Sequence, residues 1–333
     1  MANLAARIGG VVGALGLGFM AVKVWNEPNG PDTAPVLAGI FAFGALVAAL
    51  VAVMGETRRP LQYGALTALA VFLMAPFVWM VLVSLHPPKA PIPPLADLIP
   101  RNEAKEVEFS TSNYGFVLGH PTLPVSRFFF NSILVTVTVV IAQIFVSSLA
   151  AYGFARLRFK GREPLFALFI GSMMFAGPVT QIPVFLLLKN LGWLDTYAAL
   201  IVPGVSSAFA VFLLRQFFLQ IPLELDEAAR IDGAGDFLIY SRVILPLSKA
   251  ALATAAAFTF FGVWTDFFNP LIFTNSTEMR TLEVGLSIFK NSYGGTNWPL
   301  QMTAAVIVMT PLLLVFLATQ RYFTKGITLG SIK

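Results

Sequence analysis

The chain has 333 residues, of which 57% are hydrophobic and only 12% are charged, and its mean hydropathy is +0.77. A soluble domain carries roughly twice that share of charged residues, so these apolar side chains must face lipid as well as one another. The formal net charge of +5 comes from Lys and Arg in short segments between apolar runs, a pattern of membrane topology rather than nucleic-acid binding. There is no cysteine, and both histidines (His86 and His120) lie outside the apolar runs, so no metal site is expected.

Apolar runs long enough to cross a membrane recur along the whole chain. A helix needs roughly 20 apolar residues to cross the hydrocarbon core, and its backbone groups must bond within the helix. The sequence therefore predicts an all-α membrane protein, a polytopic bundle of about eight transmembrane helices. The expected spans are 8–25, 35–54, 63–85, 128–152, 164–188, 198–219, 249–273 and 302–323.

The basic residues of the connections indicate the orientation. With the N-terminus in the cytoplasm, most of them share its side, whereas the long segments 86–127 and 274–300 lie outside. Both termini are therefore predicted to be cytoplasmic. Lys23 and Trp25 follow the first span where small residues mark a cleavage site, so this span is expected to be retained. The basic residues on the cytoplasmic side, together with those of the loop around Glu227, include Arg58, Arg59, Arg156, Arg158, Lys160, Arg162, Arg321, Lys325 and Lys333.

Three polar residues within the predicted spans are candidates for a translocation path. Gln143 and Gln181 can bond to hydroxyl groups of a solute, although hydrogen bonds between helices are the commoner role. A carboxylate at the bilayer centre costs roughly 2.5–3.5 kcal/mol on insertion scales, so Asp266 either serves the path or reaches water or a neighbouring helix. An ion-coupled secondary transporter remains an alternative, but it requires paired charges and an internal repeat, and the chain shows one such carboxylate and no clear repeat.

The segment 221–248, between the sixth and seventh spans, is the most informative part of the chain. Glu224, Asp226 and Glu227 lie at the start of a short amphipathic helix, where the helix dipole favours negative charge. Gly233 and Gly235 then interrupt the run, as two short helices joined at an angle require. A helix lying on lipid headgroups is the alternative, but such a helix has a lysine-rich polar face, whereas this one begins with acidic residues.

The residue types and spacing of this segment resemble the EAA loop in the membrane subunits of ATP-driven importers. That loop reads Glu-Ala-Ala, three residues, Gly, nine residues and Ile-x-Leu-Pro. The matching residues here are Glu227-Ala228-Ala229, Gly233 and Val243-Ile244-Leu245-Pro246, with Val243 in place of Ile as the single departure. Asp232-Gly233-Ala234 also matches the Asp-Gly-Ala usual in sugar-importer subunits. Further matching phrases are Asn113-Tyr114, Phe130-Asn131-Ser132, 151–156, Trp264-Thr265-Asp266-Phe267, Asn269-Pro270-Leu271 and 320–327.

From about residue 63 onward the chain thus resembles the permease subunits of binding-protein-dependent carbohydrate importers of the ATP-binding-cassette type, in the form typified by the smaller maltose permease. The resemblance implies a six-helix core at 61–333, two extra helices in 1–60, and the cytoplasmic (inner) membrane of a bacterium or archaeon. It implies as partners a second homologous permease, a dimer of ATPase subunits and an extracytoplasmic sugar-binding protein. The chain would be non-catalytic and without its own cofactor, since it has no phosphate-binding loop and the ATPase subunits would bind ATP.

The resemblance also implies roles for particular residues, although it does not identify the sugar or related solute. The ATPase would be contacted by Glu227, Ala228, Ala229, Asp232, Gly233, Ala234, Leu245 and Pro246. The tail residues that would reach between the ATPase subunits are Gly330, Ser331, Ile332 and Lys333. The outer residues that would probe the sugar site of the binding protein, unless they form an ordinary flexible loop, are Ser292, Tyr293, Gly294, Gly295 and Thr296. A non-transporting scaffold would explain the helices but not the matched loop.

Overall fold

The computed structural model describes residues 59–87, 100, 107–120, 123–175, 177–292 and 297–328. The first two predicted spans, the loop residues 293–296 and the tail residues 330–333 lie outside this described part. The chain divides into two compact units, Met1–Leu82 and Val83–Lys333. The described part of the first unit belongs to α3 (Arg59–Ser84), a helix of 26 residues with Pro76 inside it.

Every described element of the second unit is a helix or a helical turn. In chain order they are α4 (Ser112–Leu118), α5 (Val125–Arg156), α6 (Arg162–Gly171), η2 (Ser172–Met174), α7 (Gly177–Asn190), α8 (Tyr197–Ile201), η3 (Val202–Val205), α9 (Ala208–Phe218), α10 (Glu224–Ile231), α11 (Asp236–Ile239), η4 (Tyr240–Ile244), α12 (Leu245–Leu247), α13 (Lys249–Trp264), α14 (Phe268–Phe273), η5 (Thr277–Met279), α15 (Leu282–Ser292) and α16 (Trp298–Thr328). Three of the turns are 3₁₀-helical, and η4 is a π-helical turn.

Within the described residues, four helical stretches are long and apolar enough to cross a membrane, and two bent pairs raise that number to as many as six. The continuous stretches are Leu66–Ser84, Val125–Arg156, Tyr197–Phe218 and Trp298–Tyr322. The bent pairs are Arg162–Met174 with Val179–Asn190, at 101°, and Asp236–Leu247 with Lys249–Trp264, at 80°. These stretches correspond to the third through eighth predicted spans. The total of about eight stays a prediction, because the first two spans lie outside the described part.

Two of the predicted spans are not the single helices that were expected. The run 164–188 is interrupted after Gly171 by η2, and a new helix begins at Gly177, directly before a proline that has no N–H to continue the earlier helix. The run 249–273 ends at Trp264 and resumes as α14. There the carboxylate of Asp266 accepts hydrogen bonds from the backbone N–H of Asn269 (3.2 Å) and from its side-chain amide (2.7 Å). This carboxylate satisfies a free N–H at the start of α14, so it begins a second helix.

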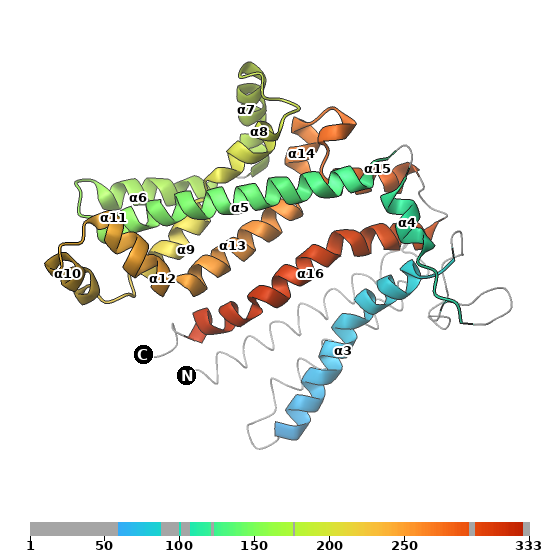
Figure 1. Cartoon of the computed structure of the whole chain (residues 1–333), viewed down its shortest axis with the longest axis horizontal. Helices are drawn as coiled ribbons and strands as arrows, with labels where there is room; N and C mark the ends of the chain where they lie inside the picture. Colours follow the sequence, from blue (N-terminus) through green and yellow to red (C-terminus); the bar gives the residue numbers. More distant parts are fainter. Residues whose placement is uncertain are drawn as a thin grey trace. The chain divides into compact units, whose positions relative to one another are not determined.

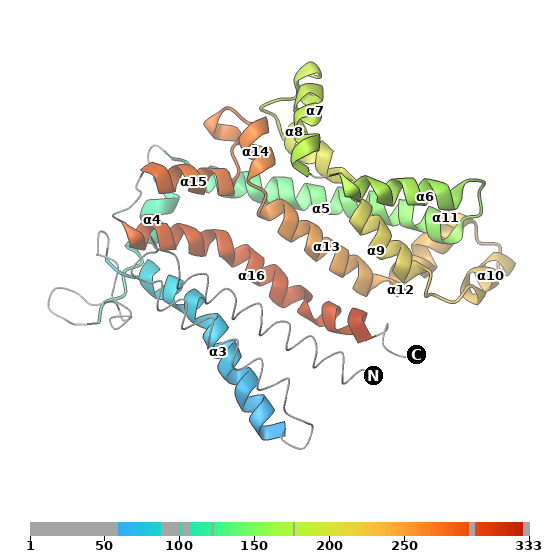
Figure 2. The same ribbon diagram turned by 180° about the vertical axis from the view of Figure 1, so that it is seen from behind.

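Helix α5 is the central helix of the second unit. It has 32 residues, and no charged residue lies between Arg127 and Arg156. At a rise of 1.5 Å per residue it is about 48 Å long, which exceeds a hydrocarbon core of roughly 30 Å. Helices α9 and α13 pack against it, and α13 packs in turn against α16. Figures 1 and 2 show α6 and α11 beside one end of α5, and α4 and α15 beside the other.

Three clusters of buried apolar side chains are distributed along α5. One surrounds its C-terminal end and includes Phe218, Ile239 and Ile244 from α9, α11 and η4. The second surrounds Phe128 near its N-terminal end, and the third surrounds Val139 near its middle. Because burial of such side chains supplies most of the free energy of helix packing, α5 is fixed to its neighbours at both ends and in the middle.

Polar side chains near the start of α5 hold the connection that precedes α15. The side-chain amide of Asn131 donates to the carbonyl oxygens of Glu278 (2.7 Å) and Arg280 (2.9 Å). The hydroxyl of Ser132 accepts a hydrogen bond from the backbone N–H of Leu282 (2.8 Å). The predicted outer segment therefore contains an ordered helix, α15, whose start is bonded to α5.

Asp195 joins the same connection to the turn after α7. Its carboxylate accepts hydrogen bonds from the backbone N–H groups of Asn275 (2.9 Å) and Ser276 (3.0 Å) and from the Ser276 hydroxyl (2.9 Å). Partial burial on its own would raise the pKa of Asp195, but these three donors lower it below the usual value for aspartate. Asp195 has a φ of 61°, which costs backbone energy that these hydrogen bonds offset.

Gly285 of α15 lies directly against the buried ring of Phe128 in α5. A Cβ atom at position 285 would lie 2.1 Å from a ring carbon of Phe128. Gly285→Ala is therefore expected to destabilise the chain by about 1–3 kcal/mol through overpacking, measured as a lower thermal unfolding temperature of the purified protein. The control is Gly153→Ala in α5, where the added Cβ would have no described atom within 4 Å. Equal unfolding temperatures for the two variants would contradict the prediction.

Candidate functional site

The candidate site is the segment 221–248, called the elbow below, which contains α10, α11, η4 and α12. Its first helix begins with the predicted acidic turn, formed by Glu224, Asp226 and Glu227. Glu224 and Glu227 are exposed, whereas Asp226 is buried. The three carboxylates therefore face different surroundings, although all lie near the positive end of the helix dipole.

Gly233 ends α10 with a backbone conformation that side chains disfavour. Its φ is +82°, and its N–H donates to the carbonyl of Arg230 (3.0 Å) while the N–H of Ala234 donates to that of Ala229 (2.9 Å). This pair of bonds is the Schellman arrangement, which closes a helix and turns the chain. The predicted turn between two short helices is thus present, and an ion pair between Arg230 and Asp236 spans it.

The outer surface of the elbow exposes apolar side chains beside acidic ones. Ile231 is 86% exposed and Phe237 is 71% exposed, on either side of the turn. Ala228 and Pro246 are also exposed, while Ala229, Ala234 and Leu245 are partly buried. The carboxylate of Glu227 makes no hydrogen bond or ion pair with the described part of the chain. Large apolar side chains exposed so fully on a short, well-formed turn are typical of a surface that another protein covers.

The inner surface of the elbow is anchored to the end of α5 by a buried ion pair. Nη1 of Arg156 lies 3.7 Å from the carboxylate of Asp226, and the two side chains are 2% and 10% exposed. Nη2 of Arg156 also donates to the carbonyl oxygens of Phe218 and Ile221, both at 2.6 Å. Burial raises the pKa of Asp226, and the positive charge of Arg156 acts in the opposite direction. Arg156 thus joins α5, the end of α9 and α10 in one contact.

A second anchor lies at the far end of the elbow, in the π-helical turn η4. A hydrogen bond of 2.8 Å joins the hydroxyls of Tyr240 and Ser148, and the ring of Tyr240 contacts that of Tyr152 at 5.3 Å between centroids. Ile239 and Ile244 are fully buried beside them. Since both ends of the elbow are fixed to α5, the elbow and this end of α5 form one packed body.

The three candidate path residues do not form a single site. Gln143 is buried and donates to the Thr259 hydroxyl (2.6 Å), which is a hydrogen bond between α5 and α13. Gln181 lies 3.5 Å from the side-chain oxygen of Asn269, the residue that Asp266 holds. A small cavity of about 20 Å³ adjoins this second group, and Asp266 and Asn269 line it. The structure therefore brings Gln181 and Asp266 together through Asn269, and it gives Gln143 an interhelical role.

Several residues that organise the site were not assigned roles from the sequence. Arg156 and Asn131 belong to sequence segments that match the importer pattern. Nothing in that pattern indicates that Arg156 pairs with Asp226, which lies 70 positions later in the chain. The remaining predicted contacts are only partly described. Ser292 ends α15, whereas the other four residues of the predicted probing loop, and the four tail residues, lie outside the described part.

Comparisons with known proteins give a consistent result. The family described as "Binding-protein-dependent transport system inner membrane component" matches residues 143–329. The trehalose/maltose transport system permease protein MalG of Thermococcus litoralis is 34% identical over 268 residues, which cover 80% of this chain and 93% of that protein. The sn-glycerol-3-phosphate transport system permease protein UgpE of Brucella abortus is 35% identical over 236 residues, covering 71% and 83%.

A solved structure shares the architecture. One chain of a bacterial ABC transporter involved in the import of the acidic polysaccharide alginate superposes with a TM-score of 0.69 at 26% identity. The similarity covers 81% of the present chain and 99% of that chain. The chain therefore shares its fold with a transporter subunit of known structure.

Proposed function

This chain belongs to the family of binding-protein-dependent transport system inner membrane components, and from that premise we propose how it works. It is a permease subunit of an ATP-binding-cassette importer, and its relatives import sugars and related solutes. In the proposed mechanism it forms the membrane path together with a second permease. An extracytoplasmic binding protein delivers the solute, and separate ATPase subunits hydrolyse ATP. This chain contributes no catalytic residue, and its termini lie in the cytoplasm.

The observation that carries the proposal is the two-sided construction of the elbow. Its outer surface presents Ile231, Phe237 and the carboxylate of Glu227, which has no partner among the described residues, while its inner surface is anchored to α5 through Arg156 and Tyr240. A partner that grips the outer surface therefore cannot move the elbow without moving α5. Glu227 pairs with a basic group of the ATPase, and Ile231 and Phe237 fill apolar recesses beside it.

Helix α5 extends this coupling across the membrane. Its other end is bonded through Asn131 and Ser132 to the connection before α15, and in our proposal the loop after α15 contacts the binding protein. ATP favours one arrangement of the ATPase dimer, and a ligand shifts an equilibrium only by its differential affinity for the two states. The chain itself supplies no such difference. It transmits the difference in affinity that the ATPase generates, and its helices move between inward-open and outward-open arrangements.

The solute is proposed by class only. The relatives named above carry trehalose or maltose, sn-glycerol-3-phosphate and alginate, which share hydroxyl groups. Gln181 and Asp266, grouped through Asn269, are the side chains that we assign to the path, because amides and carboxylates bond to hydroxyl groups. Gln143 keeps its structural hydrogen bond, and the tail residues 330–333 contact the ATPase subunits in this proposal.

The test is assembly followed by transport. Purification of the tagged full-length chain from its native membrane is expected to bring down an ATPase subunit and a second, homologous permease. The complex, reconstituted in vesicles with its binding protein, is expected to accumulate solute only when ATP is supplied. Uptake driven by an ion gradient without ATP would instead support a secondary transporter, and a chain that purified without either partner would support a scaffold.

A further inference from the structure

The connection between α5 and α6 carries several basic side chains, and only some of them are bonded within the described part of the fold. Among the cationic side chains at this end of α5, Arg156 is bonded to Asp226 and to two carbonyl groups. Arg215 is bonded to Glu163 and lies 4.0 Å from the centre of the Phe166 ring. Arg162 is bonded to Glu163 as well. These three cations therefore have structural roles in the described part of the chain.

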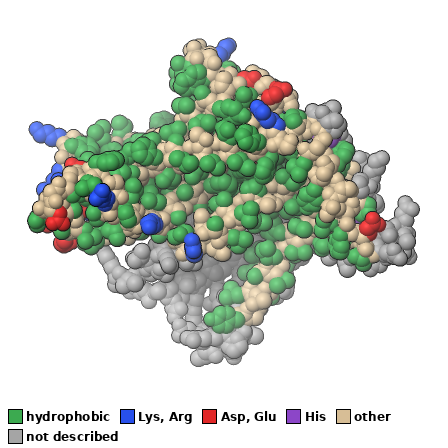
Figure 3. Space-filling view, in the orientation of Figure 1, with side chains coloured by type: hydrophobic (Ala, Val, Ile, Leu, Met, Phe, Trp, Pro, Cys, Tyr) green, Lys and Arg blue, Asp and Glu red, His purple; other side chains and the backbone are tan. Residues whose placement is uncertain are grey.

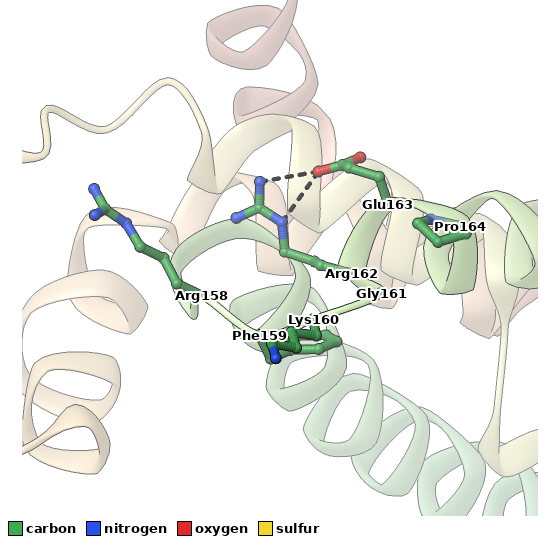
Figure 4. A pocket seen from close by; sticks show the side chains of 7 residues that line it. All are labelled: Arg158, Phe159, Lys160, Gly161, Arg162, Glu163 and Pro164. Carbon is green, nitrogen blue, oxygen red and sulfur yellow. Dashed lines mark hydrogen bonds and ion pairs between the residues drawn. The ribbon is translucent and has the colours of Figure 1, made fainter.

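Arg158 and Lys160 differ from them. Both are exposed, and neither has a hydrogen-bond or ion-pair partner among the described residues. Residues 158–164 line an open hollow of about 670 Å³. Figure 4 shows the guanidinium groups of Arg158 and Arg162 projecting on the same side of the connection, with Arg162 held by Glu163. The hollow is thus lined by cationic groups, two of which are unpaired.

Apolar surface adjoins these charges directly. Phe159, between the two unpaired cations, is 44% exposed, and Leu168 in the following helix α6 is 74% exposed. Helix α6 is half of a bent pair that is apolar enough to cross a membrane, and α5 is a continuous span that ends at Arg156. Figure 3 shows hydrophobic side chains over most of the visible face, with several Lys and Arg side chains towards the end that carries α10 and α11. The cationic hollow therefore lies where a hydrocarbon-facing surface meets water.

We propose that Arg158 and Lys160, on either side of Phe159 in the sequence (Figure 4), bind headgroups of anionic phospholipids in the leaflet on the elbow's side. Anionic headgroups match cations that have no partner among the described residues, and the acyl chains of the same lipids match the exposed apolar surface of α6. A soluble phosphate compound matches only the first of these features, and the surface of a water-soluble ATPase does not account for the exposed apolar helix. The proposal rests on the proposed function only in placing this end of α5 at the cytoplasmic surface.

The experiment uses the full-length chain in detergent, titrated with phosphatidylglycerol or phosphatidylcholine and followed by native mass spectrometry. The chain is expected to retain phosphatidylglycerol in preference. The double variant Arg158→Gln/Lys160→Gln is expected to bind it about 30-fold more weakly, since each basic residue near an anionic surface contributes a factor of roughly five to six. The control variant Lys189→Gln/Lys249→Gln removes the same charge from two other exposed sites and is expected to retain the lipid.

Three results would overturn the proposal. Equal retention of phosphatidylglycerol by the two double variants would remove Arg158 and Lys160 from any lipid site. Displacement of the lipid by inorganic phosphate at a similar concentration would assign the hollow to a soluble phosphate. A photo-crosslinker at position 159 that captured the ATPase in the assembled transporter, and no lipid, would make the connection a protein contact. Lipid binding is measured without ATP or transport, so this result and the test of the elbow can fail separately.

Discussion

Replacing Glu227 by lysine is expected to abolish ATP-dependent transport while leaving the chain folded in the membrane. Glu227 is exposed in the first turn of α10 and has no partner in the described part of the chain, so the fold loses little beyond its interaction with the helix dipole, about 0.3–1 kcal/mol. Removing one partner of a buried, hydrogen-bonded charge pair at an interface costs about 2–5 kcal/mol, and reversing its sign adds repulsion. ATPase binding is therefore expected to weaken by at least about 30-fold.

The measurements are retention of the ATPase on the purified permease and solute uptake by reconstituted vesicles. Glu224→Lys is the matched control, because it makes the same charge change in the same helical turn, three residues from the matched motif. This control variant is expected to keep the ATPase and most of the uptake. Unchanged uptake by Glu227→Lys, with Glu224→Lys behaving in the same way, would remove Glu227 from the ATPase contact.

Replacing Arg156 by leucine is expected to cost about 3–5 kcal/mol of stability, because it leaves Asp226 as an unpaired buried charge. The carbonyl oxygens of Phe218 and Ile221 lose their donor as well, and Oδ1 of Asp226 already has no hydrogen-bond partner in the described structure. The α10 end of the elbow is therefore expected to detach from α5, while the anchor at Tyr240 remains. Thermal unfolding of the purified chain measures the first effect, and limited proteolysis within 221–248 measures the second.

Two further variants separate charge from packing. Arg158→Leu removes a cation two residues away that has no partner in the described part of the chain, and it is expected to change stability by no more than about 0.5 kcal/mol. The double variant Arg156→Leu/Asp226→Leu removes both charges, and it is expected to recover a large part of the loss because no buried charge is left unpaired. If the double variant were no more stable than Arg156→Leu alone, the loss of the hydrogen bonds from Arg156 to the carbonyl groups, not the unpaired Asp226, would account for the cost.

Much of the fold could be predicted because a helix that crosses the hydrocarbon of a membrane needs a long run of uncharged residues. The uncharged run that forms α5 is recognisable without any partner, and its observed bounds extend the predicted span by only a few residues. The breaks were harder to predict. The end of α13 at Trp264 depends on the hydrogen bonds between Asp266 and Asn269. Hydropathy averaged over a window of residues does not reveal that a single carboxylate starts a new helix. Gly177 and the proline after it gave a similar local signal before α7.

The turn at Gly233 within the elbow could be predicted, and the anchoring of the elbow to α5 could not. Gly233 was identified because a left-handed turn favours glycine whatever surrounds it, and the structure gives it a φ of +82°. The anchoring by Arg156 depends on which distant segments meet, and neither the spacing of residues nor their periodicity contains that information. From sequence Asp226 is one of three acids at a helix start, and only its burial beside Arg156 distinguishes it from Glu227.

The length of α5 has a consequence for how far a small rotation reaches. A helix of 32 residues pivoting by 10° about its midpoint displaces its two tips by about 4 Å in opposite directions. Since this helix is longer than a hydrocarbon core of roughly 30 Å, an inward swing of one tip in the proposed mechanism is matched by an outward swing of the other. In the proposed mechanism the two faces of the membrane would thus open in opposition through the geometry of one rigid helix, without a separate signal passing between them.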